Sequence, residues 1–205
     1  AKDFSAAIYD SDVQLIGQTR QSLGGFVGTV GRGLRALLKV IPPDSLRPGD
    51  TVITNDPWMG GGHLPDVLTM RPIFFKGRIV AYAANVVHVS DLGGIRTAEA
   101  TDLFEEGLQI PPSLLYRENQ LNDDVFRFIQ ANSRLPHQLA GDVQAQHAAN
   151  TLLERRVLQL LEQYGMDDFD ATSTLLQDRA EVAMRERVKN LPDGIYNSEV
   201  YSDGI

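Results

Sequence analysis

Residues 67–89 read VLTMRPIFFKGRIVAYAANVVHV, and this stretch gives the clearest indication of the fold. Two runs rich in Val, Ile, Phe and Tyr, residues 67–75 and 78–89, are joined by the pair Lys76-Gly77. β-Branched and aromatic runs of this length favour strands, and a short glycine-containing link is typical of a β-hairpin turn. The sequence therefore predicts two long antiparallel strands, with the turn far from the outer ends of the hairpin.

The segment that enters this hairpin has the composition of a shaped loop. It reads NDPWMGGGHLPD over residues 55–66, with three glycines in a row before His63. Glycine reaches backbone angles that other residues avoid, and Pro65 restricts the chain between His63 and Asp66. The loop is therefore suited to hold an imidazole and a carboxylate close together where the hairpin begins.

The far end of the hairpin supplies a second histidine. The turn lies about midway between Asp66 and His88, so antiparallel pairing returns His88 to the neighbourhood of Asp66. Two histidines and a carboxylate form a typical site for a catalytic divalent metal that keeps positions open for water or substrate. We therefore expect His63, Asp66 and His88 to hold such an ion, although each residue alone is equally compatible with a surface or hydrogen-bonded role.

Two carboxylates near these ligands have two interpretations each. Asp56 lies in the loop and Asp91 precedes Gly93-Gly94, so each can brace a turn through its side-chain oxygens. Each can instead orient a ligand, and we keep Asp56 and Asp91 as candidate catalytic residues on that ground. His137 and His147 are ten residues apart on a predicted helix, which is no simple ligand spacing, and we expect them to be structural.

The N-terminal part predicts a smaller hairpin followed by a helix. Residues 4–9 and 13–16 are short apolar runs separated by the turn-forming residues 10–12. We expect the five glycines of the following stretch to let another backbone approach, because no strand and GxGxxG pattern surrounds them. Apolar residues at three- and four-residue steps predict one helical face there, made of Leu23, Phe26, Val27, Val30, Leu34, Leu37, Leu38 and Ile41.

The C-terminal part has a helical composition. Apolar residues at helical spacing predict a short helix at 125–131, a long amphipathic helix at 137–164 through residues such as Leu152 and Leu160, and a third helix at about 171–190.

We divide the chain into a mixed α/β metal-binding region (1–122), a helical region (123–191) and the start of a truncated strand segment (192–205). The expected fold class is α+β, with β-hairpins in a mixed or antiparallel sheet and a glycine-rich metal-binding loop. Because the end reads as strand material, we expect the chain to be a fragment of a larger one.

Charge and composition exclude several classes of function. The 205 residues contain 19 basic and 27 acidic side chains, for a net charge of −8, which argues against nucleic acid as a partner. The absence of cysteine leaves His, Asp and Glu as the strong metal ligands. No apolar run is long enough to predict a membrane span or a secretory signal, so we expect a cytoplasmic protein without a membrane partner.

Five blocks of the sequence follow one another in a recognisable order. They are Asp3-Phe4-Ser5, then Asn55-Asp56-Pro57 with residues 61–66, then His88 with Asp91 and Gly93-Gly94, then residues 105–112, and lastly residues 141–150. Together these blocks resemble the hydantoinase B/oxoprolinase family over almost the whole chain. They are similar in turn to the large subunits of acetone and acetophenone carboxylases.

The resemblance implies a metal site and a partner. It implies a divalent metal, zinc or manganese, on His63, Asp66 and His88, which match a His-x-x-Asp pair and a histidine 25 positions after the first. It also suggests Asp3 as a further ligand, although a cap at the end of a strand is nearly as good an interpretation. ATP would be bound by a hydantoinase A-like partner subunit in a hetero-oligomer, because this chain has no phosphate-binding loop.

Three functions remain open on the sequence. The resemblance favours the metal-binding subunit, or a fragment of it, of an ATP-dependent hydantoinase/oxoprolinase-type amidohydrolase that opens a small cyclic amide or imide. The alternative is the large subunit of an ATP-dependent acetone/acetophenone-type carboxylase. The third possibility is a non-catalytic scaffold fragment, in which the His and Asp residues serve folding or docking.

Overall fold

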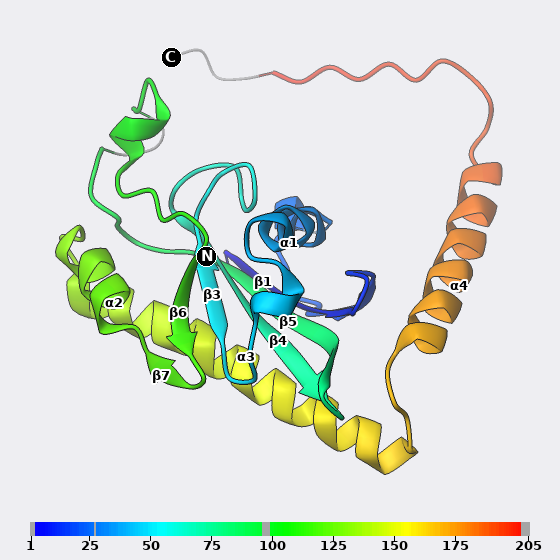
Figure 1. Cartoon of the computed structure of the whole chain (residues 1–205). Helices are drawn as coiled ribbons and strands as arrows, with labels where there is room; N and C mark the ends of the chain where they lie inside the picture. Colours follow the sequence, from blue (N-terminus) through cyan, green and yellow to red (C-terminus); the bar gives the residue numbers. More distant parts are fainter. Residues whose placement is uncertain (1–2, 27, 96–98, 202–205) are drawn as a thin grey trace.

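The computed structural model describes residues 3–26, 28–95 and 99–201. Its centre is a seven-stranded sheet with the order β2-β1-β5-β4-β3-β6-β7, in which every pairing is antiparallel (Figure 1). The predicted α+β class is confirmed, and the sheet is the antiparallel alternative. The strands are β1 (Phe4–Asp10), β2 (Leu15–Gln18), β3 (Thr51–Thr54), β4 (Asp66–Phe75), β5 (Arg78–His88), β6 (Ser113–Arg117) and β7 (Gln120–Leu121).

The β4–β5 hairpin at the centre of the sheet has the predicted register. Asp66 pairs directly with His88 at the open end. The two turn residues, Lys76 and Gly77, both have positive φ, 49° and 82°, as in the hairpin turns that match the right-handed twist of strands. The turn sets the pairing near the tip, and a bulge between Ile73 and Phe74 then shifts the register by one residue, which places His88 opposite Asp66.

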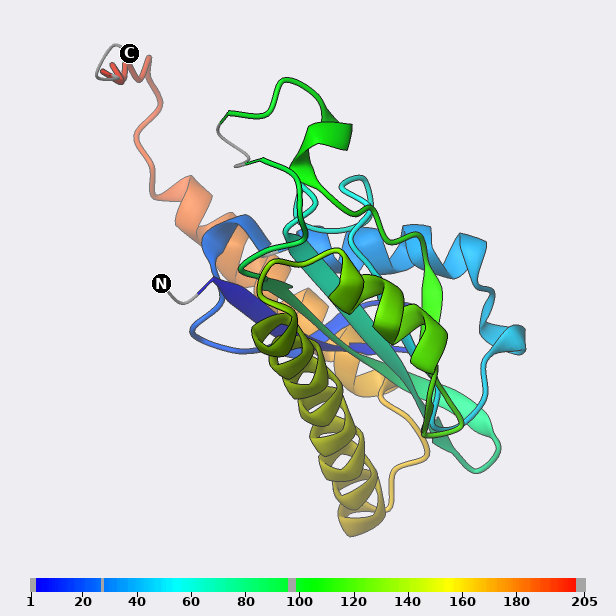
Figure 2. The same ribbon diagram turned by 90° about the vertical axis from the view of Figure 1, so that its left-hand side faces the viewer.

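Helices cover both faces of the sheet (Figures 1 and 2). α1 (Thr29–Val40) packs on one face, while α2 (Asp123–Ala131) and α3 (Pro136–Tyr164) pack on the other. Side chains of a strand alternate between faces, so Leu68 joins the core beneath α1 and its neighbour Val67 joins the core beneath α2 and α3.

A polar network fixes α3 on its face of the sheet. Asn85 of β5 donates to the Asn150 Oδ1 atom at 2.8 Å and to the main-chain oxygen of Gln146 at 3.0 Å. Asn150 in turn donates to Thr69 of β4 at 3.0 Å. All four side chains are buried. Because buried hydrogen bonds are satisfied in one helix register only, the network sets the position of α3 along the strands.

The predicted apolar face of α3 is partly wrong. Gln146 and Asn150 occupy the inward line of the helix, which continues to Val157 and Leu161. Leu152 and Leu160 lie off this line and are 46% and 41% exposed. None of the helices in the described parts of the chain is long and apolar enough to cross a lipid bilayer.

α1 begins at Thr29, whereas the apolar spacing predicts a helix from Leu23. Gly24–Phe26 forms a short 3-10 turn instead, with its phenylalanine buried. Gly28 has φ of 85°, a left-handed angle that glycine adopts at little cost and that interrupts a helix. Val27, also assigned to the predicted face, lies outside the described residues.

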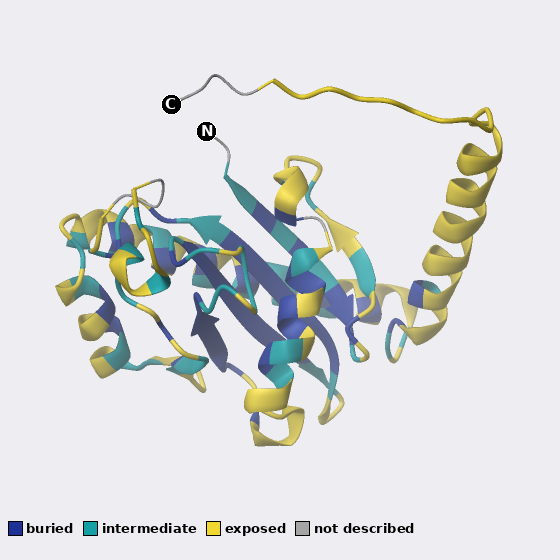
Figure 3. Ribbon diagram, turned by 90° about the horizontal axis from the view of Figure 1, so that it is seen from above, coloured by how far each residue is buried: buried dark blue, intermediate teal, exposed yellow. Residues whose placement is uncertain are grey.

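The described part of the predicted C-terminal strand segment, residues 192–201, forms no strand. α4 (Asp170–Lys189) buries one residue, Ser173, which donates to Asp10 at the end of β1, and Gln177 donates to the main-chain oxygen of Leu15 in β2. Residues 192–201 after α4 are irregular and exposed (Figures 1 and 3). Ile195 and Val200 are 92% and 93% exposed, so no sheet edge lies beside them to accept strand hydrogen bonds. Residues 202–205 lie outside the described part of the chain.

Candidate metal centre

Three neighbouring strands bring Asp3, His88 and Asp66 into one row. Asp66 is the register partner of His88 across β4 and β5, and the His88 N–H donates to the Asp3 main-chain oxygen at 3.0 Å just before β1 begins. Directly opposed residues in antiparallel strands have their side chains on the same face. The row therefore lies on the α1 face, at the end of the sheet where β1 and β4 begin and β5 ends.

The glycine-rich loop adds His63 to this row. Asp66 N–H donates to the His63 main-chain oxygen at 3.2 Å, which folds the imidazole back over the carboxylate. Gly62 has φ of 107°, an angle that favours glycine. A Cβ atom at Gly61 would lie 1.7 Å from Asp66 Oδ2, so a side chain at this position has no room.

Three donor atoms converge at the end of the hairpin. His88 Nδ1 lies 3.0 Å from Asp66 Oδ1 and 3.2 Å from His63 Nε2, and His63 Nε2 lies 3.1 Å from Asp66 Oδ1. Ligands about 2.1 Å from one divalent ion are about 3.0 to 3.4 Å from one another in octahedral or tetrahedral geometry. The donor set and its spacing thus fit a divalent metal ion.

Asp3 lies at the margin of this group. Its Oδ2 atom is 4.0 Å from His88 Nδ1. Its other oxygen, Oδ1, is buried and has no hydrogen-bond partner among the described residues. A buried carboxylate oxygen without a donor is costly, and a cation beside it would satisfy it. Asp3 lies outside the group of three residues whose ligand atoms are all within 4.8 Å of one another, and its role as a further ligand stays a prediction.

Asp56 and Asp91 have other partners in this structure. Asp56 Oδ1 accepts from the Trp58 N–H at 2.9 Å, which is an Asx turn in the glycine-rich loop. Asp91 accepts from Ser133 and from both the main chain and the guanidinium of Arg134. Burial raises the pKa of Asp91, but the Arg134 and Ser133 hydrogen bonds and the Arg134 charge outweigh it and leave the pKa below its ordinary value.

Two residues that sequence reasoning did not assign to the site hold the ligand loop. Asn55 is fully buried and donates through Nδ2 to the main-chain oxygens of Leu64 and Leu108, both at 2.8 Å. Glu106 accepts from the Leu64 N–H at 2.8 Å. Both residues lie in blocks that carry the family resemblance, and this was the one signal in the sequence that could have pointed to them. Their contacts join segments far apart in the chain, which local patterns do not predict.

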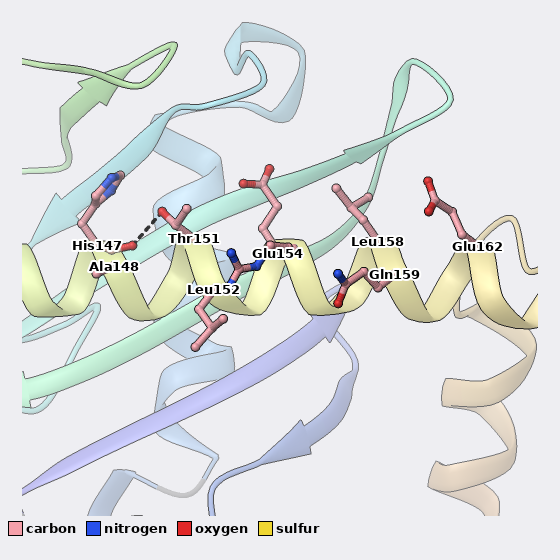
Figure 4. A pocket seen from close by; sticks show the side chains of 9 residues that line it. His147, Ala148, Thr151, Leu152, Glu154, Leu158, Gln159 and Glu162 are labelled. Carbon is pink, nitrogen blue, oxygen red and sulfur yellow. Dashed lines mark hydrogen bonds between the residues drawn. The ribbon is translucent and has the colours of Figure 1, made fainter.

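His147 belongs to a separate region on α3. Its ring stacks on Tyr116 with centroids 3.6 Å apart, and its Nδ1 atom lies 3.1 Å from Thr51 Oγ1. Burial, with a smaller contribution from the Arg71 charge, lowers its pKa to about 4. An open pocket of about 610 Å³ beside it is lined by α3 residues alone and contains none of the converging ligands (Figure 4).

Comparison with known proteins shows the family of this chain. One family model, described as Hydantoinase B/oxoprolinase, matches residues 1–205. The chain belongs to the hydantoinase B/oxoprolinase family. The family resemblance inferred from the five sequence blocks is thereby confirmed.

Relatives within and around this family have different activities in their names. The caprolactamase subunit beta of Pseudomonas jessenii is 32% identical over 201 residues, which cover 96% of this chain and 34% of that protein. The acetophenone carboxylase delta subunit of Aromatoleum aromaticum is 31% identical over 194 residues, covering 87% and 28%. The chain thus spans about a third of the length of these curated relatives.

Two solved structures share the fold. The crystal structure of the ATP-dependent caprolactamase from Pseudomonas jessenii superimposes with a TM-score of 0.86 at 31% identity, covering 95% of this chain and 34% of that one. A nucleotide-free acetone carboxylase superimposes with a TM-score of 0.68 at 18% identity, covering 83% and 23%. The second likeness is one of fold alone.

Proposed function

We propose that this chain supplies the metal-holding part of an ATP-dependent amidohydrolase that opens a small cyclic amide or imide. The observation that carries the proposal is the convergence of His63, Asp66 and His88 on one point, in a member of the hydantoinase B/oxoprolinase family. The naming of a 32% identical relative as a caprolactamase subunit supports the reaction class, since caprolactam is a cyclic amide.

The exposure of the ligands suggests how substrate reaches the centre. The side chain of Asp66 is 4% exposed, whereas those of His63 and His88 are 26% and 35% exposed. Asp66 would therefore hold an ion from the buried side, with Asp3 next to His88 as a further ligand. A bound divalent ion would supply Lewis-acid polarisation of a carbonyl oxygen or acidify a water ligand. Because the two histidines are partly exposed, substrate would approach the ion from their side, which faces solvent.

Asp56 and Asp91 have a supporting role in this proposal. Asp56 shapes the loop that presents His63, and Asp91 ties the segment after β5 to the start of α3 through Arg134. Carboxylates that hold ligand-bearing loops act on a centre by orienting its ligands rather than by reacting themselves.

The proposal assigns ATP to another polypeptide. The sequence has no glycine-rich phosphate loop between a strand and a helix. Subunit names among the relatives, beta in the caprolactamase and delta in the carboxylase, support a multi-subunit enzyme. We propose a hydantoinase A-like ATP-binding partner in a cytoplasmic hetero-oligomer.

A ketone carboxylase is the second candidate. It is favoured by the acetophenone carboxylase delta subunit, which is 31% identical, almost as similar as the caprolactamase subunit. The same metal ligands would serve a carboxylase and a hydrolase. The two activities would therefore be distinguished by the substrate and by the remaining subunits.

The test is an assay of the protein copurified with its ATP-binding partner. ATP consumption is measured with a panel of cyclic amides and imides, and separately with ketones in bicarbonate, for the native complex and for one carrying His63→Ala. We expect ATP consumption and ring opening with a cyclic amide that the variant loses. Turnover of ketones alone would replace the hydrolase with the carboxylase. Full activity in the His63→Ala complex would refute a catalytic metal centre.

A further inference from the structure

The peptide groups on both sides of Leu64 are held by two side chains, Glu106 from outside the ligand loop and Asn55 from its first position. The Leu64 N–H donates to Glu106 Oε2 at 2.8 Å, and the Leu64 main-chain oxygen accepts from Asn55 Nδ2 at 2.8 Å. The Leu64 side chain is itself fully buried. The residue that follows His63 is therefore fixed by its N–H, its carbonyl and its side chain.

The segment that carries Glu106 is also well supported. Leu108 N–H donates to the Leu92 main-chain oxygen at 2.8 Å, and Ile95 N–H donates to the Glu105 main-chain oxygen at 2.8 Å. Gly107, with φ of 125°, lies so close to this neighbouring segment that a Cβ atom there would be 2.4 Å from the Leu92 oxygen. Glu106 thus projects from a segment pinned to the residues just after β5, the strand that carries His88.

This arrangement joins the two parts of the candidate metal centre. The Leu64 N–H that Glu106 holds belongs to the peptide bond between His63 and Leu64, and Asp66 follows two residues later. A shift of that peptide would move the imidazole directly and the carboxylate through Pro65. Errors of about 1 Å in ligand placement are enough to weaken a preorganised site strongly.

We propose that Glu106 is a positioning residue for the metal ligands His63 and Asp66. This inference rests on the proposed metal centre. A carboxylate accepts a main-chain N–H more strongly than a neutral oxygen does, which explains the use of a glutamate at this position. Glu106 holds the ligand loop against the end of the sheet, so that His63 stays in register with His88.

The adjacent glutamate provides a matched control. Glu105 lies in the same turn, η3 (Leu103–Glu106), and has the same charge. Its carboxylate accepts from the N–H and hydroxyl of Thr101, at 2.7 and 3.0 Å, and makes no hydrogen bond to the described residues of the ligand loop. Substitution of Glu105 therefore reproduces the change in charge and the disturbance of the turn without releasing Leu64.

The experiment compares Glu106→Ala, Glu106→Gln and Glu105→Ala with the native chain. Each purified chain is stripped of metal, melted by circular dichroism and titrated with Zn²⁺ and with Mn²⁺ by calorimetry. We expect Glu106→Ala to bind metal about 10- to 100-fold more weakly, the usual cost of losing an outer support of a metal ligand. Glu106→Gln keeps an acceptor oxygen and should lose about threefold. Glu105→Ala should bind like the native chain.

Each outcome bears on the inference. The inference is supported if Glu106→Ala binds metal most weakly, Glu106→Gln binds more tightly and the native chain binds most tightly. The metal-free Glu106 variants should then melt at temperatures like that of Glu105→Ala. Equal affinity of Glu106→Ala and Glu105→Ala overturns it while leaving the metal centre in place. If Glu106→Ala melts too low to titrate, native-like affinity of a folded Glu106→Gln chain overturns it. Failure of the native chain to bind either ion overturns the metal centre and this inference with it.

Discussion

Gly61 and Gly62 serve the ligand loop in different ways. At Gly61 a side chain would collide with the carboxylate of Asp66, whereas at Gly62 the surrounding space is open but φ is 107°. Gly60 has neither constraint, since a Cβ atom there would make contacts of 3.6 Å or more at an ordinary backbone angle. The three consecutive glycines therefore differ in what a substitution would cost.

The first prediction compares alanine at two of these positions. Gly61→Ala should displace the Asp66 carboxylate and weaken metal binding by about 100-fold, because the new methyl group would overlap Oδ2 and move the Oδ1 atom that faces both histidines. Gly60→Ala should bind metal almost as the native chain does. Metal titration of both variants checks this. Equal affinities would mean that the loop gives way easily and does not set the position of Asp66.

The second prediction concerns pH and His147. Its pKa of about 4 in the folded chain is below the ordinary histidine value of 6.5, so the unfolded chain binds more protons between these values. The free energy of unfolding should therefore fall as the pH is lowered from 6.5 towards 4. His147→Gln should lose this part of the pH dependence, even though the lost stacking on Tyr116 lowers its stability at pH 7.

The control for this prediction is His137→Gln. His137 is exposed at the start of the same helix, α3, and its replacement should leave the contribution of the buried His147 in place. Urea unfolding at several pH values between 4 and 7 provides the measurement. A native slope in His147→Gln would place the titrating group elsewhere.

At the scale of elements, α1 and the glycine-rich loop are in direct contact. A Cβ atom at Gly33, inside α1, would lie 1.6 Å from the main-chain oxygen of Met59. The sequence-based expectation that helix glycines admit another backbone is thus met at Gly33. Gly28 differs, because it has open space around it and a left-handed backbone angle.

The third prediction uses this contact. Alanine normally stabilises a helix interior by about 1 kcal/mol relative to glycine. Gly33→Ala should nevertheless destabilise the chain, by about 1 to 3 kcal/mol, because the added methyl group overpacks the interface. Gly141→Ala, in α3 with open space around it, should instead stabilise by about 0.5 to 1 kcal/mol. Denaturant unfolding should show a lower free energy of unfolding for Gly33→Ala and a higher one for Gly141→Ala. A higher free energy of unfolding in both variants would mean that the loop does not rest on α1.

Local signals predicted the hairpin and the neighbours it creates. Strand composition and the Lys76-Gly77 turn are short-range features that predict His88 near Asp66, whereas the direct pairing of the two residues also needs the bulge between Ile73 and Phe74. The strand order was not predictable in this way, because β1 pairs with β5 across a long stretch of sequence. The inward face of α3 was misjudged because the buried side chains of Gln146 and Asn150 hydrogen-bond to Asn85 and Thr69 of the sheet, a compensation that hydrophobic spacing does not reveal.

In the candidate site, too, some residues could be predicted from local sequence signals and others could not. Its side-chain ligands follow from the hairpin register and the loop composition. The supports at Asn55 and Glu106 do not, because they bind main-chain groups of segments that are far apart in sequence. Asp91 was selected from the sequence because it lies close to His88 along the chain. In the structure its oxygens accept hydrogen bonds from Ser133 and Arg134 instead of facing the ligands.

At the scale of the whole molecule, the chain should depend on a partner for ATP. The fourth prediction is that the purified chain shows no saturable ATP hydrolysis, because no glycine-rich phosphate loop joins a strand to a helix in its sequence. Addition of the ATP-binding partner and substrate should produce ATP consumption. Saturable hydrolysis by the pure chain, unchanged after a further purification step, would contradict the division of labour proposed here.

The central claim is that His63, Asp66 and His88 together hold one divalent metal ion. The most direct measurement is the metal content of the purified chain after incubation with Zn²⁺ or Mn²⁺ and gel filtration, alongside His63→Ala, His88→Ala and the control His137→Ala. We predict one ion per chain in the native protein and in the control, and loss of that ion in both ligand variants with little change in the metal-free melting temperature. A native chain without metal, or ligand variants that keep a full equivalent, would contradict the account.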